Sequence, residues 1–165
     1  MLIRAATEND FEGIWLIFQA VVANGDTYVF SPQATREDAH DYWFGPGVRS
    51  FVAEVDGAIS GMYKLITNQR DLGSHVANAS FMVCPKAHGK GIGEEMGRHC
   101  LEEARKAGYA AMQFNFVVST NTGAVALWKK LGFSIVGTLP KVFRHQSLGM
   151  VDAYVMHRFL DGSGA

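Results

Sequence analysis

A glycine-rich segment from Val83 to Gly97 constrains the fold of this chain more than any other feature. The apolar run Ala77–Val83 predicts a strand before it, and apolar residues recur at helical spacing from Ile92 toward Gly108 after it. Consecutive amides of such a strand–turn–helix segment point at one place, and the helix start adds about half a positive charge. The segment therefore predicts an anion site suited to a pyrophosphate.

Two phosphate-binding motifs can be tested against this segment. A Walker loop requires Lys-Ser or Lys-Thr after its last glycine, whereas Gly93 is followed by two glutamates. A dinucleotide fingerprint is closer, because Gly91, Gly93 and Gly97 give G-x-G-x-x-x-G. That fingerprint normally follows the first strand of a βαβ unit, and here it lies mid-chain. The hypothesis of a nucleotide-binding oxidoreductase thus rests on these glycines alone. A further alternative is that the segment is a glycine-rich turn that binds no ligand.

Length and composition favour one soluble domain. The chain has 165 residues, enough to bury a core, and we expect a single domain over residues 1–160 with a flexible tail at 161–165. The formal charge is −1 and both signs are interspersed, which predicts neither nucleic-acid nor membrane partners. The chain shows no signal-peptide core or transmembrane run, and Cys84 and Cys100 suggest no disulfide framework. We therefore expect a cytoplasmic protein.

Hydrophobic periodicity predicts eleven elements in the order β-α-α-β-β-β-α-β-α-β-β. The expected strands are Leu2–Ala6, Ser50–Val55, Ala58–Ile66, Ala77–Val83, Tyr109–Val118, Phe133–Gly137 and Val151–Phe159. The expected helices run from Phe11 to about Asn24, over Thr35–Phe44, from Ile92 toward Gly108 and over Asn121–Lys130. Thr7 should cap the first helix with Asp10 at its third position, and Pro140–Met150 should be irregular. This order predicts a mixed sheet with helices on both faces.

Two blocks of the sequence resemble the GNAT superfamily of acyl-CoA-dependent N-acetyltransferases. His88-Gly89-Lys90-Gly91-Ile92-Gly93 is similar to the family's (Gln/Arg)-x-x-G-x-(Gly/Ala) loop, with His88 in place of Gln or Arg. Asn121 to Phe133 resembles the family's N-x-x-A-x-x-L-Y-x-K-x-G-F block, with Trp128 in place of tyrosine. The element order resembles the family's fold along essentially the whole chain. The resemblance implies an α/β (α+β) GNAT fold: a mixed, mostly antiparallel seven-stranded sheet, splayed between its fourth and fifth strands.

The resemblance implies acetyl-CoA as the cofactor, with its pantetheine arm in the gap between the splayed strands. The residues expected to bind it are Met82, Val83, His88, Gly89, Lys90, Gly91, Ile92, Gly93, Asn121 and Trp128. Free backbone groups of Phe81, Met82 and Val83 should face the gap. One amide there, assigned to Met82, should stabilise the developing oxyanion, a contribution of about 3–4 kcal/mol. Asn121 can alternatively serve only as a helix N-cap.

The acid and the base of the implied reaction are less evident. Many family members carry a tyrosine where this chain has Trp128, and an indole N–H is not a practical acid. We therefore interpret Trp128 as a packing wall, and a non-catalytic acyl-CoA-binding or sensing module is the alternative function. Asn78 and Asn115 are the catalytic candidates beside Met82, with Glu54 and Tyr154 as further polar candidates.

Several chemistries receive no support from the sequence. The histidines do not have the spacing of metal ligands, so we expect no metal. His99 should lie exposed on the central helix. Cys84 lacks an evident His/Asp partner, which disfavours a ping-pong mechanism through a covalent acyl-enzyme. We expect direct, sequential transfer to the amine.

Within the family, Thr27-Tyr28 and the segments Gly137–His145 and Val151–Met156 look like the branch that acetylates small amino acids and their analogues. That branch includes phosphinothricin-type and proline-analogue acetyltransferases. The resemblance implies a small-molecule amine as partner, with a homodimer as a possible assembly. The substrate-binding candidates are Tyr28, Phe30, Asn78, Asn115 and Arg144. Asn78 and Asn115 can alternatively serve only to satisfy local backbone.

Overall fold

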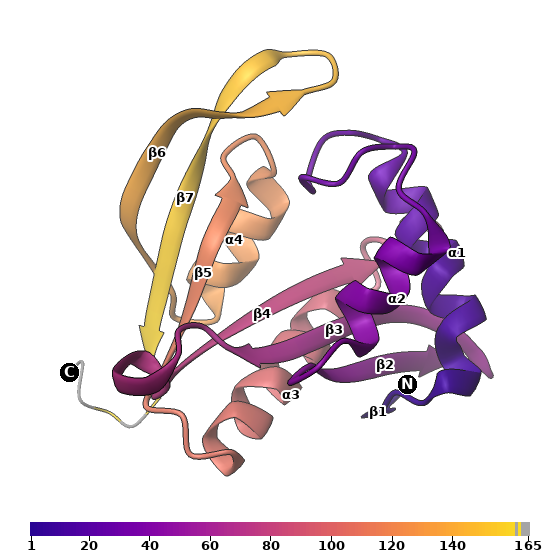
Figure 1. Cartoon of the computed structure of the whole chain (residues 1–165), viewed down its shortest axis with the longest axis horizontal. Helices are drawn as coiled ribbons and strands as arrows, with labels where there is room; N and C mark the ends of the chain where they lie inside the picture. Colours follow the sequence, from indigo (N-terminus) through magenta and orange to yellow (C-terminus); the bar gives the residue numbers. More distant parts are fainter. Residues whose placement is uncertain (161, 163–165) are drawn as a thin grey trace.

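A seven-stranded sheet forms the centre of the computed structural model, which describes residues 1–160 and 162 (Figure 1). The strands lie in the order β1-β2-β3-β4-β5-β7-β6, and only the β4–β5 pair is parallel. Their bounds are β1 Leu2–Ala5, β2 Arg49–Val55, β3 Ala58–Thr67, β4 Val76–Val83, β5 Ala111–Val118, β6 Ser134–His145 and β7 Gly149–Phe159. The predicted mixed, mostly antiparallel sheet is confirmed, whereas four of the five predicted tail residues lie outside the described residues.

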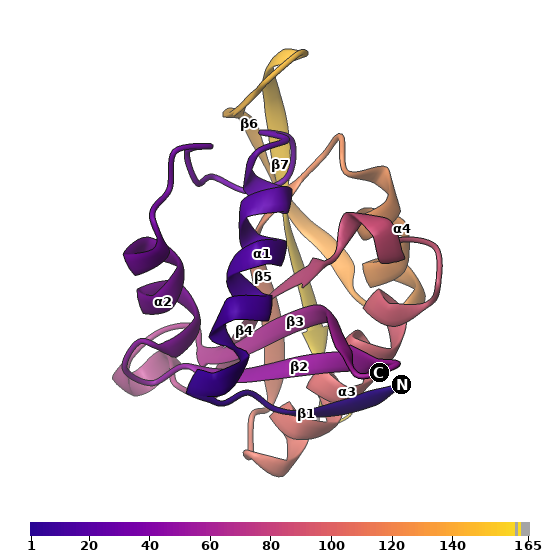
Figure 2. The same ribbon diagram turned by 90° about the vertical axis from the view of Figure 1, so that its right-hand side faces the viewer.

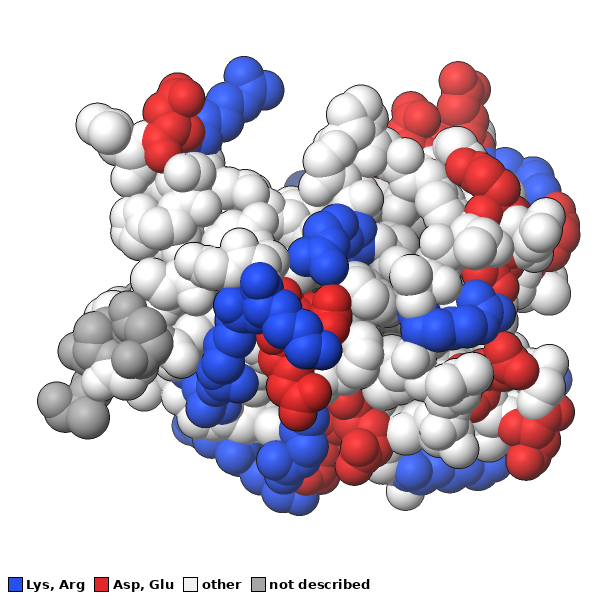
Figure 3. All heavy atoms as spheres, turned by 90° about the horizontal axis from the view of Figure 1, so that it is seen from below, with Lys and Arg blue, Asp and Glu red and all other residues white. Residues whose placement is uncertain are grey.

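The helices cover both faces of the sheet, as predicted (Figures 1 and 2). They are α1 Phe11–Val22, α2 Arg36–Phe44, α3 Ile92–Lys106 and α4 Thr122–Lys130. Because side chains alternate along a strand, Met62 and Met82 pack with α1 and α2, whereas Tyr63 and Phe81 belong to the core under α3 and α4. None of the described helices is long and apolar enough to cross a membrane. In the view from below, acidic and basic side chains are interspersed (Figure 3).

The start of α1 is fixed by a carboxylate that also anchors β1. Asp10 accepts hydrogen bonds from the Thr7 backbone N–H at 2.8 Å and from both Arg4 guanidinium nitrogens at 2.8 Å. The predicted pairing of Thr7 with Asp10 is therefore confirmed, although residues Glu8–Asp10 form a 3-10 turn before α1 begins. The Arg4 guanidinium beside it lowers the pKa of Asp10 to about 2.

We expect Asp10→Asn to lower the free energy of unfolding by about 2 kcal/mol at pH 7, since one pKa unit corresponds to about 1.4 kcal/mol. The folded-state pKa of Asp10 lies below the unfolded value, so this stabilisation is full above about pH 4 and is lost as the pH falls toward 2. Urea unfolding of the wild type and Asp10→Asn at pH 7 and pH 2.5 measures the difference. An equal difference at both pH values would contradict this account.

The segment predicted as irregular, Pro140–Met150, instead forms the tip end of a long β6–β7 hairpin. Proline is tolerated here because β6 is the edge strand and its register shifts between Leu139 and Phe143, where Lys141 has a φ of 53°. Beyond the shift the pairing resumes and ends with His145 opposite Gly149. The hairpin tip reaches the α1–α2 loop, where Gln146 N–H donates to the Gly25 carbonyl at 3.0 Å.

The predicted splay lies between β4 and β5. These strands pair only at Val76 with Ala111 and Ala77 with Met112, and then diverge. β4 continues alongside β3 as far as Val83, and β5 continues alongside β7. Beyond Ala77, the backbone N–H and C=O groups on one side of β4 therefore have no strand partner. A functional site can form along this side of β4.

Candidate functional site

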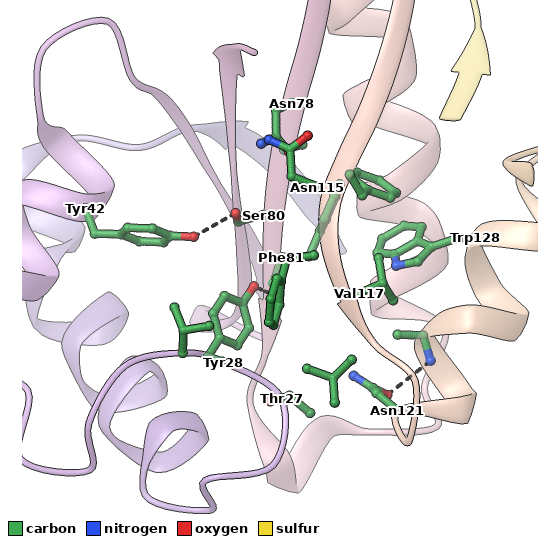
Figure 4. A pocket seen from close by; sticks show the side chains of 16 residues that line it. Thr27, Tyr28, Tyr42, Asn78, Ser80, Phe81, Asn115, Val117, Asn121 and Trp128 are labelled. Atoms are coloured by element: carbon green, nitrogen blue, oxygen red, sulfur yellow. Dashed lines mark hydrogen bonds between the residues drawn. The ribbon is translucent and has the colours of Figure 1, made fainter. Parts of the chain in front are cut away.

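Two cavities meet at the splay, and Figure 4 shows the residues that line the smaller of them. A smaller cavity of about 260 Å³ lies between α2, the α1–α2 loop and the diverging strands. A larger cavity of about 580 Å³ runs from the end of β4 to the glycine loop and α4. Both cavities are lined by the same six residues where they meet: Thr27, Tyr28, Phe81, Asn121, Ala124 and Trp128. A ligand in the larger cavity can therefore reach one in the smaller.

The glycine loop forms one wall of the larger cavity. Gly89 and Gly91 have φ values of 76° and 78°, and a Cβ built on either would meet nothing within 4 Å. Gly91 is the N-cap residue of α3, so the unpaired amides of the first helical turn are available to an anion. His88, Ile92 and Gly93 also line this cavity as predicted, whereas Lys90 is exposed and outside the lining.

Two carboxylates, of Asp26 and Glu94, line the larger cavity, and neighbouring cations offset the one beside this loop. Glu94 lines the larger cavity, but its carboxylate accepts hydrogen bonds from Arg98 at 2.7 Å and Lys130 at 2.6 Å. The hydrogen bond from Lys130 lowers the pKa of Glu94 most, and the hydrogen bond from Arg98 lowers it further. One carboxylate is thus offset by two cations, and the Lys130 pair joins α3 to α4.

The backbone of β4 presents the residues on either side of Met82 to the gap. Cys84 N–H donates to the Ser60 carbonyl on β3 at 2.9 Å, so Met82, two residues earlier, also directs its backbone toward β3. Phe81 and Val83 face the other way: the Phe81 carbonyl accepts from the Tyr28 hydroxyl at 2.5 Å, and the Val83 carbonyl lies 3.2 Å from His88 Nε2. The prediction that the Met82 amide faces the oxyanion is therefore wrong, although Met82 does line the larger cavity.

Tyr28 lies where the two cavities meet and occupies the place of a strand partner. Its hydroxyl satisfies the carbonyl of Phe81 that β5 leaves free (Figure 4). Burial raises the pKa of Tyr28 well above its usual value, so it is a neutral donor at physiological pH. Phe30, also predicted to bind substrate, packs against Phe18 and Tyr42 and does not line the smaller cavity.

Trp128 and Asn121 both line the junction of the cavities. Trp128 is 7% exposed and contacts Phe81 and Phe114, with ring centroids 4.8 and 4.7 Å apart. Trp128 thus belongs to a buried aromatic cluster that walls the junction of the two cavities. Asn121 Oδ1 accepts from Ala124 N–H at 3.2 Å, so its N-cap role is confirmed, and the same side chain lines both cavities.

Asn78 and Asn115 both line the smaller cavity, but they differ in how they are engaged (Figure 4). Asn115 donates to Asn68 Oδ1 at 2.7 Å and accepts from Gln113 Nε2 at 2.9 Å. Asn78 makes no side-chain hydrogen bond to any other described residue. Asn78 is therefore the amide that remains free for a ligand.

Other predicted residues lie away from both cavities. Arg144 is exposed on β6, Glu54 pairs with Arg4, and Tyr154 packs against the core on β7. His99 was expected to be exposed, but its Nδ1 lies 2.7 Å from the hydroxyl of the buried Tyr63. Within residues 1–160, no three His, Cys, Asp or Glu side chains gather as a metal site.

Sequence reasoning missed a group of polar residues beside the smaller cavity. Tyr42 on α2 donates to Ser80 Oγ on β4 at 2.7 Å, and both residues line the cavity. Beneath them Lys64 on β3 is 7% exposed, and burial lowers its pKa to about 8. The available signal was a lysine inside the apolar strand Met62–Ile66, where a charge needs an explanation.

Comparison with known proteins agrees with this geometry. Residues 11–133 match the model of the acetyltransferase (GNAT) family, which is more than half of the chain. The L-amino acid N-acetyltransferase AaaT of Escherichia coli K12 is 27% identical over 96% of this chain and 97% of its own length.

Two solved structures share the fold. A GCN5-related N-acetyltransferase from Kribbella flavida superposes with a TM-score of 0.90 at 40% identity and covers 96% of each chain. A phosphinothricin acetyltransferase from Sinorhizobium meliloti, solved with acetyl-CoA, superposes with a TM-score of 0.87 at 21% identity and covers 99% of this chain and 91% of its own.

Proposed function

The chain belongs to the acetyltransferase (GNAT) family and is an acetyl-CoA-dependent N-acetyltransferase, and from this premise we propose that it acetylates the amine of a small free amino acid or analogue by direct, sequential transfer. The observation that carries the proposal is the junction of the two cavities at the β4–β5 splay. The larger cavity would take the cofactor, and the smaller would take the acceptor.

The residues of the larger cavity fit coenzyme A. Gly89 and Gly91 leave the space that a pyrophosphate needs beside the first turn of α3. Phe81 and Val83 present backbone amides without a strand partner to the pantetheine arm, and Trp128 and Asn121 line its far side. When bound, acetyl-CoA supplies the acetyl group as an activated thioester.

The chain's own contribution to the chemistry is positioning and hydrogen bonding. The Phe81 amide faces the gap at the junction of the cavities, where it can donate to a reacting carbonyl oxygen. Such a preorganised donor contributes about 3–4 kcal/mol to barrier lowering. The aromatic cluster of Trp128, Phe81 and Phe114 excludes water, which strengthens that hydrogen bond.

The lining of the smaller cavity supports a compact acceptor. Among the described residues it carries amides, hydroxyls and aromatic rings but no charged side chain. A polyamine or lysine side chain would call for carboxylates, which this lining lacks. Without a strong base, an amine with a larger neutral fraction is favoured: near pH 7 about one in ten peptide α-amino groups is neutral, against about one in 2,500 lysine amines. Free amino acids lie between these limits.

Initial-rate kinetics test direct transfer. Release of free thiol from acetyl-CoA would be followed while acetyl-CoA and an aliphatic L-amino acid are varied together. We expect intersecting double-reciprocal lines and no thiol release without the amine. Parallel lines, together with acetylated protein in intact-mass spectra, would establish a covalent acyl-enzyme and overturn direct transfer.

We expect Trp128→Phe to keep most turnover and to weaken coenzyme A binding by about threefold to tenfold, because phenylalanine preserves part of the aromatic wall. Calorimetric titration with coenzyme A and steady-state rates give the two quantities. If kcat fell about a hundredfold at unaltered affinity, Trp128 would be acting in proton transfer, since acid–base groups contribute about 10²–10⁴-fold.

A further inference from the structure

A buried positive charge lies beneath the smaller cavity, whose own lining is uncharged. Lys64 is 7% exposed, and no carboxylate of the described residues forms an ion pair with it. Its ammonium donates to the Tyr42 carbonyl at 3.0 Å and lies 3.1 Å from the centroid of the Tyr42 ring. A buried charge without a counter-charge is costly, so its retention calls for an anionic partner or another compensation.

A hydrogen-bonded pair connects Lys64 to the cavity surface. Lys64 lies directly opposite Ser80 in the β3–β4 register, so both side chains stand on the face covered by α2. Tyr42 spans the two, because the Lys64 ammonium lies against its ring and its hydroxyl donates to Ser80 Oγ at 2.7 Å. Figure 4 shows the hydrogen bond from Tyr42 to Ser80. Because Ser80 accepts from Tyr42, the hydroxyl hydrogen of Ser80 itself remains available to a ligand.

Asn78 adds a second free donor on the same strand face. It stands two residues before Ser80 on β4 and lines the cavity, and its amide has no side-chain partner among the described residues. Two donors, above one buried cation and without a nearby carboxylate, match the acceptor-only oxygens of a carboxylate.

We propose that Ser80, held by Tyr42 over the Lys64 ammonium, and the neighbouring Asn78 form a subsite for the carboxylate of the acceptor. This subsite rests on the proposed function and specifies it: an amino acid with a free α-carboxylate is selected over its carboxamide and over the amine that lacks the group. The competing explanation is that Lys64 only satisfies a carbonyl near the end of α2.

The test compares L-leucine, L-leucinamide and isoamylamine as acceptors in the wild type, Lys64→Met and Ser80→Ala. We expect the wild type to favour leucine over the other two, and Lys64→Met to lower the leucine-to-leucinamide ratio of kcat/KM tenfold or more. Ser80→Ala should lower it about threefold to tenfold. The amine pKa of each probe is the same with every protein, so the change in ratio isolates the carboxylate contact. The affinity for coenzyme A, measured by calorimetry, should stay within about twofold.

Direct binding provides a readout without turnover. Calorimetric titration of leucine and leucinamide into each protein with coenzyme A present should show a preference for the acid in the wild type that is reduced in both variants. An unchanged preference in both variants, each confirmed as folded by its melting curve, would overturn the subsite and leave Lys64 as a cap of α2. If Lys64→Met does not fold, Ser80→Ala and Tyr42→Phe decide. If no amine is acetylated, the proposed acceptor fails, while the titrations still confirm or refute the subsite.

Discussion

Gly91→Val is expected to weaken acetyl-CoA binding about a hundredfold or more while the protein remains folded. Gly91 caps α3 at a φ of 78°, a conformation that a β-branched residue resists. A side chain there would also enter the open space beside the amides of the first helical turn. Calorimetric titration with acetyl-CoA measures the loss, and Gly93→Val should act in the same direction because Gly93 lines the same cavity.

The matched control lies at the other end of the same helix. Gly108 has a φ of 84° and also has nothing within 4 Å of its Cβ position, but it lies outside both cavities. Gly108→Val should therefore destabilise the protein to a similar extent and leave acetyl-CoA affinity unchanged. If Gly91→Val and Gly108→Val bind acetyl-CoA equally well, the glycine loop does not hold the pyrophosphate.

Tyr28→Phe is expected to lower kcat/KM for the acceptor about tenfold or more. The variant removes the only donor that the described residues offer to the Phe81 carbonyl, and a buried unsatisfied acceptor costs about 1–3 kcal/mol. The strand would shift to satisfy this carbonyl, and the neighbouring Phe81 amide would leave its position at the junction. Because the Phe81 amide is assigned to the reacting carbonyl and not to the pyrophosphate, the loss should exceed any change in acetyl-CoA affinity.

Tyr109→Phe controls for the loss of a tyrosine hydroxyl. Tyr109 shares a hydrogen bond of 2.7 Å with Thr67, away from both cavities. Its removal should leave kcat/KM within about twofold of the wild type. Equal rates for Tyr28→Phe and Tyr109→Phe would mean that Tyr28 does not hold β4 in its reactive position.

The sequence predicted those parts of the fold that local chemistry determines. Glycines between an apolar strand and an apolar helix indicated the loop at Gly89–Gly93, and periodicity indicated the element order. The strands at the base of the β6–β7 hairpin were predicted, but its tip end was missed because Pro140 marks a break in a central strand, and nothing local shows that β6 is an edge.

The site was predicted less completely, because its geometry depends on pairings between distant segments. The Met82 assignment failed because the register between β4 and β3 decides which residues of β4 direct their backbone groups toward β3. No local sequence pattern reveals that register. Tyr28 was predicted only as a substrate contact, yet its hydroxyl donates to the carbonyl of Phe81, far away in sequence. Lys64 was overlooked because its neighbours across β4 and α2 appear only in the folded chain.

A competition experiment tests the acceptor assignment most directly. Acetyl-CoA would be mixed with the protein and with equal concentrations of free amino acids, proline-like imino acids, polyamines and a lysine peptide. Mass spectrometry of the products then gives relative kcat/KM values. The account predicts that an N-acetyl amino acid forms in step with free coenzyme A, at least tenfold faster than any product from the peptide or a polyamine. If the peptide or a polyamine is acetylated tenfold faster instead, the small-amino-acid acceptor is wrong.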